Sequence, residues 1–279
     1  MSSVDPNSNH GKTNSPSSQD PAAPLVESLQ DLTIVESLDS EGKTKSTTFY
    51  HITKDEEVYF GQTSKNKRET TIPEFNAALQ RIPDQDIYPA VPSDSQLTLA
   101  PEGLDEPSVY VKRPGLQWYD EMCGTTWIPK TVLDETLVME KISQSQPPHP
   151  NIIRYHGCRV RRGYITCIVL EQLDQTLHEF VSTDEFQDFD KTGLCESVAS
   201  AVEFLHSLGL AHNDINPYNI MLRTDRTPAL IDFDSCQPVG HRLQSLGTEG
   251  WYEKPFYTSE KEHDLYAMGK LRKWIQDPR

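Results

Sequence analysis

Residues 212–220 read HNDINPYNI, and residues 229–234 read ALIDFD. The first stretch is too rich in Asn, Asp and Pro to be the interior of a helix, so we expect it to be a loop. Apolar runs flank it at 205–211 and 220–222. A polar loop between two buried elements is well placed to present its side chains to a ligand.

A β-hairpin is predicted to follow this loop. Residues 220–222 and 229–231 are short apolar runs, and the polar sequence TDRT at 224–227 forms the turn between them. The hairpin brings Asn219 and Asp232 together at one end. Amide and carboxylate oxygens are hard ligands, and Mg²⁺ prefers one or two carboxylates combined with nucleotide phosphates. The pattern therefore predicts a magnesium and nucleotide site at this end of the hairpin.

Composition argues against several classes of protein. The chain has 279 residues and a formal net charge of −16, which disfavours nonspecific binding to nucleic acid or to anionic membranes. The longest apolar run, 164–170, is far shorter than the ~18 residues that a membrane span requires. The five cysteines form no C-x-x-C pair and fit free thiols in a reducing compartment. We therefore expect an intracellular protein, cytoplasmic or nuclear.

The loop and hairpin resemble the catalytic loop and metal-binding strand of the protein-kinase superfamily, in which H-R-D-x-x-x-x-N is followed by D-F-G. Within it, the chain resembles short fungal protein-kinase-like proteins that carry H-N-D-I-N-P-x-N-I and I-D-F-D-S-C. Two positions depart from the general pattern: Asn213 stands in place of Arg, and Asp234 in place of Gly. The resemblance implies that Asp214 orients the attacking hydroxyl, and that Asn219 and Asp232 bind Mg²⁺.

Motifs on both sides of the loop keep the order of a kinase large lobe. Apolar residues at helical spacing in 194–205 predict an amphipathic helix that leads into the loop. The sequence GTEGW at 247–251 resembles a kinase substrate-binding loop, which implies that the Thr248 hydroxyl bonds Asp214. The sequence DLYAMG that begins at Asp264 is similar to the start of the helix beneath the catalytic loop. The resemblance implies that its Asp binds the backbone of that loop.

The small lobe is expected around Lys112. The sequence SVYVK at 108–112 alternates as a strand does and is similar to the V-A-I-K strand, whose Lys holds the α and β phosphates of ATP. Glu135 is the preferred partner of this Lys, because apolar residues follow it at three, four and seven positions. Glu140 is the competing candidate, since it lies at the more usual distance from the HPNI sequence at 149–152.

The resemblance also locates the adenine and phosphate contacts. Strand-like runs at 152–160 and 164–170 lead to Glu171 and Leu173, at the hinge where kinase backbone groups bind adenine. The glycine-rich loop that precedes the lysine strand in kinases is reduced to the single Gly103. We therefore expect either weak nucleotide binding or a different cover over the phosphates.

These patterns predict an α+β, two-lobed kinase-like fold with a truncated C-terminal lobe. An extra module precedes the two lobes, with strands at 47–52 and 57–60 and a helix that begins at the capping box TIPE, 71–74. The predicted organisation is a disordered N-terminal tail at 1–30, the additional strand and helix module at 31–95, the small lobe at 96–170, and the large lobe at 171–279, which lacks the late helices.

The resemblance implies an ATP- and Mg²⁺-dependent phosphotransferase that acts on a Ser or Thr hydroxyl. Two alternatives stay open. A pseudokinase binding module is suggested by the missing glycine loop and by Asn216, which stands where Ser/Thr kinases carry a Lys that neutralises the transferred phosphate. A small-molecule kinase is suggested by I-D-F-D, which aminoglycoside and choline kinases share. The GTEGW sequence argues against that second alternative.

Overall fold

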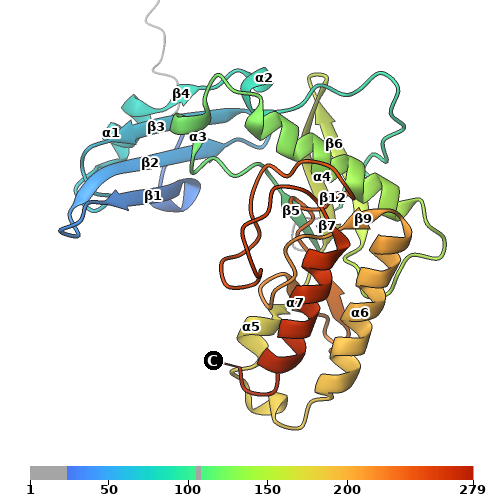
Figure 1. Ribbon diagram of the computed structural model, residues 1–279. Helices are drawn as coiled ribbons and strands as arrows, with labels where there is room; N and C mark the ends of the chain where they lie inside the picture. The colour runs from blue at the N-terminus through green and yellow to red at the C-terminus, as the bar shows by residue number, and fades with distance from the viewer. Residues whose placement is uncertain (1–23, 105–107, 279) are drawn as a thin grey trace, which may run out of the picture.

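The computed structural model of the protein describes residues 24–104 and 108–278. Three parts follow one another along the chain: an N-terminal module, a small lobe built on a three-stranded sheet, and a lobe dominated by two long helices (Figure 1). No helix of the described residues is both long enough and apolar enough to cross a membrane. The mixture of helices and sheets agrees with the predicted α+β class.

The N-terminal module is a four-stranded antiparallel sheet in the order β1-β2-β3-β4, with a short helix against it. Phe49 and Phe75 lie at the centre of its core, with ring centroids 4.7 Å apart in an edge-to-face arrangement. Thr71 and Glu74 form the predicted capping box at the start of this helix. The elements of the module are η1 (Leu29–Asp31), β1 (Thr33–Leu38), β2 (Thr44–Ile52), β3 (Val58–Thr63), α1 (Ile72–Ala78), β4 (Gln80–Arg81) and α2 (Asp84–Ile87).

The predicted tail, residues 1–30, extends too far toward the C-terminus, because residues around Val26 belong to the module. Residues 1–23 lie outside the described residues, but Val26 is only 1% exposed and packs in the core of the module. Its backbone N–H donates to Asn76 Oδ1 (3.0 Å), and Asn76 Nδ2 donates back to the Val26 carbonyl (2.8 Å). The reason for the error is compositional, because the few apolar residues there, Leu25, Val26 and Leu29, follow a long polar stretch and give no clear period.

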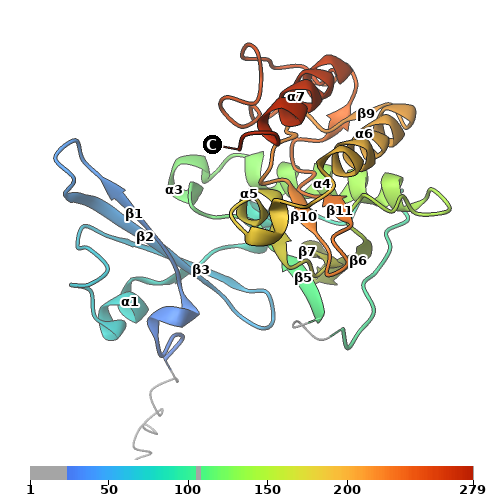
Figure 2. The same ribbon diagram turned by 90° about the horizontal axis from the view of Figure 1, so that it is seen from below.

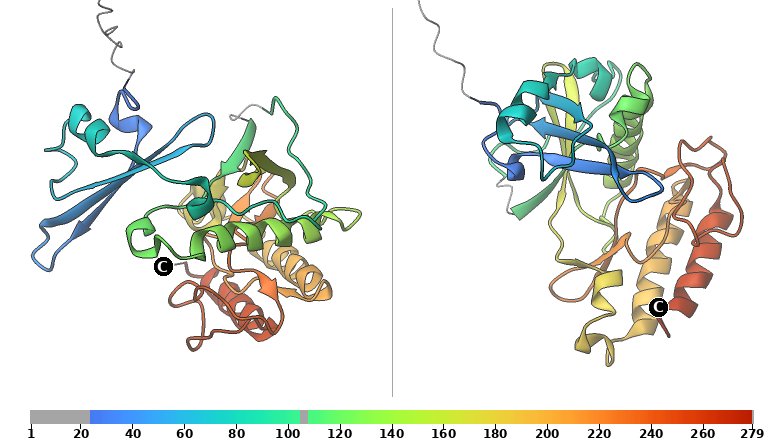
Figure 3. Two further views of the ribbon diagram at one scale, coloured as in Figure 1. Left: turned by 90° about the horizontal axis from the view of Figure 1, so that it is seen from above. Right: turned by 90° about the vertical axis from the view of Figure 1, so that its left-hand side faces the viewer.

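The small lobe is a sheet in the order β5-β7-β6, with α4 packed against it. In Figure 3 (left), α4 crosses in front of the two lobes while the N-terminal module lies to one side. The predicted strands at 108–112, 152–160 and 164–170 all exist, with ends shifted by a few residues. The elements are β5 (Val109–Lys112), α3 (Tyr119–Met122), α4 (Trp127–Ser143), β6 (Tyr155–Arg161) and β7 (Tyr164–Glu171).

The segment before β5 does not occupy the position of a glycine-rich loop. Leu99 forms a parallel bridge with Cys158 of β6, at the edge of the sheet opposite β5. The two backbones approach so closely that a Cβ on Gly157 (φ 121°) would lie 2.6 Å from the Thr98 carbonyl oxygen. Beyond this bridge, Ala100 and Leu104 pack against Val109 of β5 and Val169 of β7, and Gly103 lies between them in the sequence with open space around it.

The large lobe holds α6 and α7 side by side (Figures 1 and 2). The predicted helix at 194–205 lies within α6, and the helix expected from Asp264 begins three residues earlier, at Lys261. The elements are β8 (Gln175–Thr176), α5 (Leu177–Phe180), η3 (Asp184–Phe186), α6 (Lys191–Ser207), β9 (Leu210–Ala211), β10 (Ile220–Leu222), β11 (Pro228–Leu230), β12 (Gln237–Pro238) and α7 (Lys261–Trp274).

The predicted hairpin after the loop is confirmed. Strands β10 and β11 pair antiparallel, with Ile220 opposite Leu230 and Leu222 opposite Pro228. The turn closes through the Arg223 N–H, which donates to the Thr227 carbonyl (3.0 Å). Because the strands pair in this register, the residues just before β10 and just after β11 meet at one end of the hairpin.

Candidate active site

Asp264 of α7 anchors the loop at 212–220. This carboxylate is fully buried and accepts hydrogen bonds from the backbone N–H groups of His212 (2.9 Å) and Asn213 (2.8 Å). The His206 Nε2 of α6 lies 2.8 Å from the same carboxylate. Both long helices of the large lobe therefore fix the loop, as the resemblance implied for Asp264.

His212 links the loop to the hairpin. Its Nε2 donates to the Ile231 carbonyl (3.0 Å), and its Nδ1 accepts from the Asp214 N–H (3.3 Å). These two bonds place a ring hydrogen on Nε2. The ring also packs edge-to-face on Phe233, with centroids 5.1 Å apart.

Asn213, in the position where kinases usually carry Arg, is buried and has a left-handed backbone (φ 65°). Its Nδ2 lies within hydrogen-bond distance of the carbonyls of Ala211 (2.8 Å) and Ser235 (3.0 Å) and of Ser259 Oγ (3.0 Å). Asn tolerates the left-handed region better than most residues. This neutral side chain joins the loop to two downstream segments, where a cation would be costly to bury.

The Asp214 carboxylate accepts four hydrogen bonds. Oδ1 accepts from the Thr248 N–H (2.7 Å) and from Asn216 Nδ2 (3.1 Å). Oδ2 accepts from Thr248 Oγ1 (3.1 Å) and from Asn219 Nδ2 (2.9 Å). The close approach needs Gly247, because a Cβ there would lie 2.7 Å from the Asn213 carbonyl oxygen. The contact between Thr248 and Asp214 is the one that the sequence predicted.

The Asn216 side chain is bonded to other residues of the site. Only 1% of its surface is exposed. Its Nδ2 donates toward Asp214 and Thr248 Oγ1 (3.0 Å), and its Oδ1 accepts from the backbone N–H groups of Tyr218 (2.8 Å) and Asn219 (3.2 Å). The residue holds Asp214 in position, and its neutral amide supplies no positive charge for a transferred phosphate.

Asn219 and Asp232 meet at the end of the hairpin, as predicted. The Ile231 N–H donates to the Asn219 carbonyl (2.9 Å). Asn219 Nδ2 is committed to Asp214, so its amide oxygen is the group that a metal ion could bind. Asp232 has a left-handed backbone (φ 61°) and keeps 36% of its side-chain surface accessible.

Lys112 of β5 connects the two lobes. Its Nζ lies 2.7 Å from Glu135 Oε1 of α4 and 2.5 Å from Asp232 Oδ1. Glu135 Oε1 also accepts from the Phe233 N–H (3.3 Å), so α4 is tied directly to the segment that carries Asp232. The pairing of Lys112 with Glu135 agrees with the preferred prediction.

The charges of this cluster shift its pKa values. Burial alone would lower the pKa of Lys112, but Glu135 and Asp232 together raise it well above its ordinary value. Burial raises the pKa of Glu135, and Lys112 opposes that rise. Burial also works against ionised Asp232, yet Lys112 holds the pKa of this carboxyl below its ordinary value. Lys112 is therefore charged at neutral pH, beside an ionised Asp232.

Glu140, the competing partner for Lys112, has a different role. Its carboxylate accepts from the Thr98 N–H (2.7 Å), from Thr98 Oγ1 (2.9 Å) and from the Tyr155 hydroxyl (2.9 Å). These contacts hold the edge segment near Leu99 against α4 and β6. Glu140 is thus a buried structural residue, five residues after Glu135 in α4.

The hinge residues lie at the end of β7, where the sequence placed them. Val109 of β5 pairs with Glu171, and Leu173 is buried. The Glu171 side chain forms an ion pair with Arg223 of the β10–β11 hairpin, with Oε1 2.7 Å from Nε and Oε2 2.9 Å from Nη2. This side chain ties the hinge to the large lobe. Backbone groups of the hinge are therefore the ones left for any contact to a base.

A cavity of about 300 Å³ lies between β5, α4 and the end of the hairpin. Lys112, Glu135 and Asp232 line it together with aromatic residues that sequence reasoning did not single out. Tyr110 is half-exposed and projects from the same face of β5 as Lys112, because side chains two apart share a face. Trp118 enters the lining from the segment between β5 and α4. The alternation of the SVYVK strand was the available signal for Tyr110.

The donor set fits a metal ion held jointly with phosphates. Among residues 24–104 and 108–278, no group of three or more His, Cys, Asp or Glu side chains could hold a metal ion alone. Asn219 and Asp232 offer one amide and one carboxylate oxygen, the hard ligands that Mg²⁺ takes alongside nucleotide phosphates. The site therefore suits magnesium in complex with a nucleotide better than free magnesium.

Comparison with known proteins gives one family. The model of the family described as "Protein kinase domain" matches residues 119–269, more than half of the chain. This range contains Glu135 and every feature from the hinge to the start of α7. The strand with Lys112 and the N-terminal module lie outside the matched residues.

Curated relatives agree with the family model. The serine/threonine-protein kinase/endoribonuclease IRE1 of Hypocrea jecorina is 28% identical over 167 residues, which cover 53% of this chain and 12% of that protein. The serine/threonine-protein kinase STE20 of Saccharomyces cerevisiae is 27% identical over 143 residues, 48% of this chain and 15% of that protein. Homeodomain-interacting protein kinase 1 of Mus musculus is 30% identical over 125 residues, 42% and 10% respectively. The chain spans only 10% to 15% of the length of these three relatives.

Proposed function

The chain belongs to the protein kinase family, and from that premise we propose that it transfers the γ-phosphate of ATP to a Ser or Thr hydroxyl of a protein, with Mg²⁺. The observation that carries the proposal is the ion-pair arrangement at Lys112. A single ammonium group lies within 2.7 Å of both Glu135 and Asp232, so the strand, the helix and the metal-binding segment are assembled together. Kinases need this assembly for transfer.

Each site residue has a role in this proposal. Asp214 orients the acceptor hydroxyl and receives its proton, and four hydrogen bonds fix the carboxylate for that task. Asn219 and Asp232 hold Mg²⁺, which when bound neutralises charge on the phosphates. Lys112, kept charged by Glu135, contacts the phosphates.

The adenine and the acceptor complete the proposal. Backbone groups of Glu171 and Leu173 bind the base at the hinge, and the nucleotide extends from there toward Lys112. The acceptor approaches Asp214 from the side of Thr248. The cysteines are all free thiols, and four of the five are buried, which supports a reducing compartment, cytoplasm or nucleus.

A pseudokinase that only binds nucleotide or protein is the second candidate. Its specific support is Asn216, whose buried amide supplies no cation for the transferred phosphate. A small-molecule kinase draws support from Asp234 in the I-D-F-D sequence. The bonds from Thr248 to Asp214 favour a protein acceptor, because they come from a segment that resembles a kinase substrate-binding loop.

Thermal unfolding with and without magnesium tests the nucleotide site. At a concentration one hundred times the Kd, a ligand that binds only the folded state adds about 2.7 kcal/mol. ATP with Mg²⁺ should therefore raise Tm by roughly 5–10 °C. Asp232→Ala should abolish this shift, because it removes the metal carboxylate. Asp188→Ala is the matched control, since Asp188 is exposed in the segment between η3 and α6 and lines neither the cavity nor the pocket beside the hinge.

Two outcomes would count against the site. An equal shift of Tm in EDTA would mean that ATP binds without the metal, and the roles of Asn219 and Asp232 would then be wrong. No shift for wild type at millimolar ATP would remove the nucleotide itself from the proposal.

A further inference from the structure

The N-terminal module meets the small lobe at the tips of two hairpins. One tip is the β2–β3 turn with Glu56, and the other is the β6–β7 turn with Arg162. Both residues have a left-handed backbone, with φ 61° at Glu56 and φ 50° at Arg162. Gly or Asn normally takes such positions, because a larger side chain there costs free energy. Two charged residues at these places suggest that their side chains are needed.

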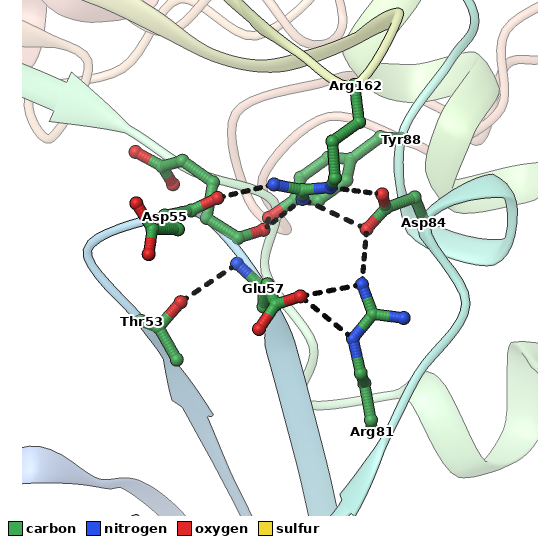
Figure 4. Close-up of polar contacts among 8 residues, drawn as sticks. Thr53, Asp55, Glu57, Arg81, Asp84, Tyr88 and Arg162 are labelled. Atoms are coloured by element: carbon green, nitrogen blue, oxygen red, sulfur yellow. Dashed lines mark hydrogen bonds and ion pairs between the residues drawn. The ribbon is translucent and has the colours of Figure 1, made fainter.

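Arg162 binds the β2–β3 turn of the N-terminal module through its guanidinium group. Figure 4 shows its guanidinium group lying between Asp55 and Asp84. Nη1 donates to the Asp55 carbonyl (2.6 Å) and Nη2 to the Glu56 carbonyl (3.1 Å), while Nε and Nη2 bind the Asp84 carboxylate (2.5 and 3.0 Å). The hydroxyl of Tyr88 donates to the same Glu56 carbonyl (3.0 Å). The backbone of the turn is thus fixed from the small lobe.

Glu56 makes the reciprocal contact. Its side chain is 2% exposed, and its two carboxylate oxygens accept from Arg113 Nε (3.0 Å) and Nη2 (3.2 Å). Arg159 Nη1 of β6 lies 3.9 Å from the same carboxylate. Arg113 directly follows Lys112 at the end of β5. The carboxylate of Glu56 therefore holds the end of the strand that carries the phosphate-binding lysine.

The same module packs against the helix that carries Glu135. Val58 of β3 and Tyr88 share an apolar cluster with Ile128 in the first turn of α4. Leu116, fully buried in the same cluster, comes from the segment between β5 and α4. Ile128 is seven residues before Glu135, which is two helical turns. The module thus contacts both of the elements that supply the Lys112–Glu135 pair.

Strand β5 needs an external support. It pairs only with β7 among the strands of the described residues, so its outer edge has no partner strand within them. The segment that precedes it lies against β6 at the opposite edge. In a sheet, a strand with one partner is held by half of the hydrogen bonds that a central strand has. Contacts outside the sheet must then fix the position of Lys112.

We infer that the N-terminal module, residues 24–88, positions the Lys112–Glu135 pair for nucleotide binding, and that Glu56 is the positioning residue through which it acts. The module fixes β5 through Arg113 and α4 through Ile128. Its relevance to catalysis rests on the proposed function, whereas its hold on β5 does not.

Hydrogen exchange of the protein without nucleotide tests the hold on β5 directly. Glu56→Gln should speed amide exchange in β5 and in the first two turns of α4 by on the order of tenfold, because it removes the buried carboxylate that binds Arg113 Nε and Nη2. Exchange in α6 should not change. Glu57→Gln is the matched control, because the neighbouring Glu57 pairs with Arg81 inside the module. If Glu56→Gln does not fold, Arg162→Ala is the alternative variant, because it removes the bonds from the small lobe to the β2–β3 turn and to Asp84.

A second measurement connects the module to nucleotide. The affinity for magnesium-ATP, followed by the fluorescence of Trp118 and Trp127 in the cavity, should fall about tenfold in Glu56→Gln and stay at the wild-type value in Glu57→Gln. Exchange at the wild-type rate in β5 of both Glu56→Gln and Arg162→Ala would overturn the inference. Faster exchange with unchanged magnesium-ATP affinity would overturn it too. Failure of the wild type to bind magnesium-ATP would instead refute the proposed function, and the exchange rates would still decide whether the module holds β5.

Discussion

Asp214→Asn should lower phosphate transfer by a factor on the order of 10² or more, the usual effect of losing a positioned general base. The substitution keeps the size and shape of the side chain and removes its negative charge. A neutral amide cannot take the proton of the acceptor hydroxyl. Because Lys112, Glu135 and Asp232 are untouched, we expect the affinity for magnesium-ATP to stay nearly unchanged.

Thr248→Val should give a milder defect whose size follows from the geometry. The substitution removes the hydroxyl, which donates to Asp214 Oδ2 (3.1 Å) and accepts from Asn216 Nδ2 (3.0 Å), and it leaves the backbone N–H bond to Asp214 Oδ1 (2.7 Å). A hydrogen bond to a charged group contributes about 1.5 kcal/mol or more, and each 1.4 kcal/mol of barrier is about tenfold in rate. We therefore expect a loss of roughly tenfold. Thr248→Ser, which keeps the hydroxyl, is the control and should stay close to wild type.

Single-turnover transfer of the γ-phosphate is the assay, with Ser- and Thr-containing peptides and small alcohols as acceptors. Binding of magnesium-ATP is measured in parallel on the same protein, so that loss of binding and loss of chemistry are separated. The assignment of Asp214 fails if wild type binds magnesium-ATP yet transfers phosphate no faster than Asp214→Asn on every acceptor. The pseudokinase would then be the better function.

Two further predictions concern the hinge and the N-terminal boundary. Burial opposes ionisation of Glu171, but its bonds to Arg223 lower its pKa below the ordinary 4.5. The pair therefore stabilises the fold above about pH 4.5, and this contribution is lost as pH falls through the lowered pKa. Glu171→Gln should lower the free energy of unfolding at pH 7 by about 1 kcal/mol and reduce the loss of stability in acid. It should leave the affinity for magnesium-ATP unchanged. Equal acid unfolding curves for wild type and Glu171→Gln would contradict this prediction. Deleting residues 1–23 should leave Tm unchanged. Deleting residues 1–30 should lower Tm by several degrees, because Val26 is then lost from the core. Equal Tm values for the two truncated proteins would show that Val26 contributes nothing to stability.

The site could be predicted because its residues are close together in the chain or lie in elements with a clear period. Asp214 and Asn219 are five residues apart in one loop, and the hairpin register brings Asp232 to them. The apolar residues that follow Glu135 in the helix favour it over Glu140 as the partner of Lys112. The structure has this pair, since a helix must turn its apolar face to the sheet and so directs Glu135 toward Lys112.

The contacts of the N-terminal module could not be predicted in this way. Glu56 lies 57 residues from Arg113, and its carbonyl is bound by Arg162 at a separation of 106 residues. Neither pairing leaves a local pattern, because both depend on how separate sheets dock. One signal was present in the Arg-Gly turn at 162–163. Two-residue hairpin turns with two left-handed residues favour Asn-Gly, so an Arg in this place marks a side chain with a specific use.

Asn213 and Asn216 both depart from the kinase pattern, and the effect of these departures on the geometry of the loop differs from their effect on charge. Both stand where the resemblance leads one to expect a cation, and both are buried with their amides bonded to neighbouring segments. The geometry around Asp214 is therefore complete without either charge, and a neutral hydrogen bond to Ser259 fixes the downstream segment. Asn216 does not supply the positive charge that a Lys at its position would bring to the transferred phosphate, and such a charge acts on the transition state and not on the ground state. The rate of transfer relative to Asp214→Asn therefore decides between a slow kinase and a pseudokinase.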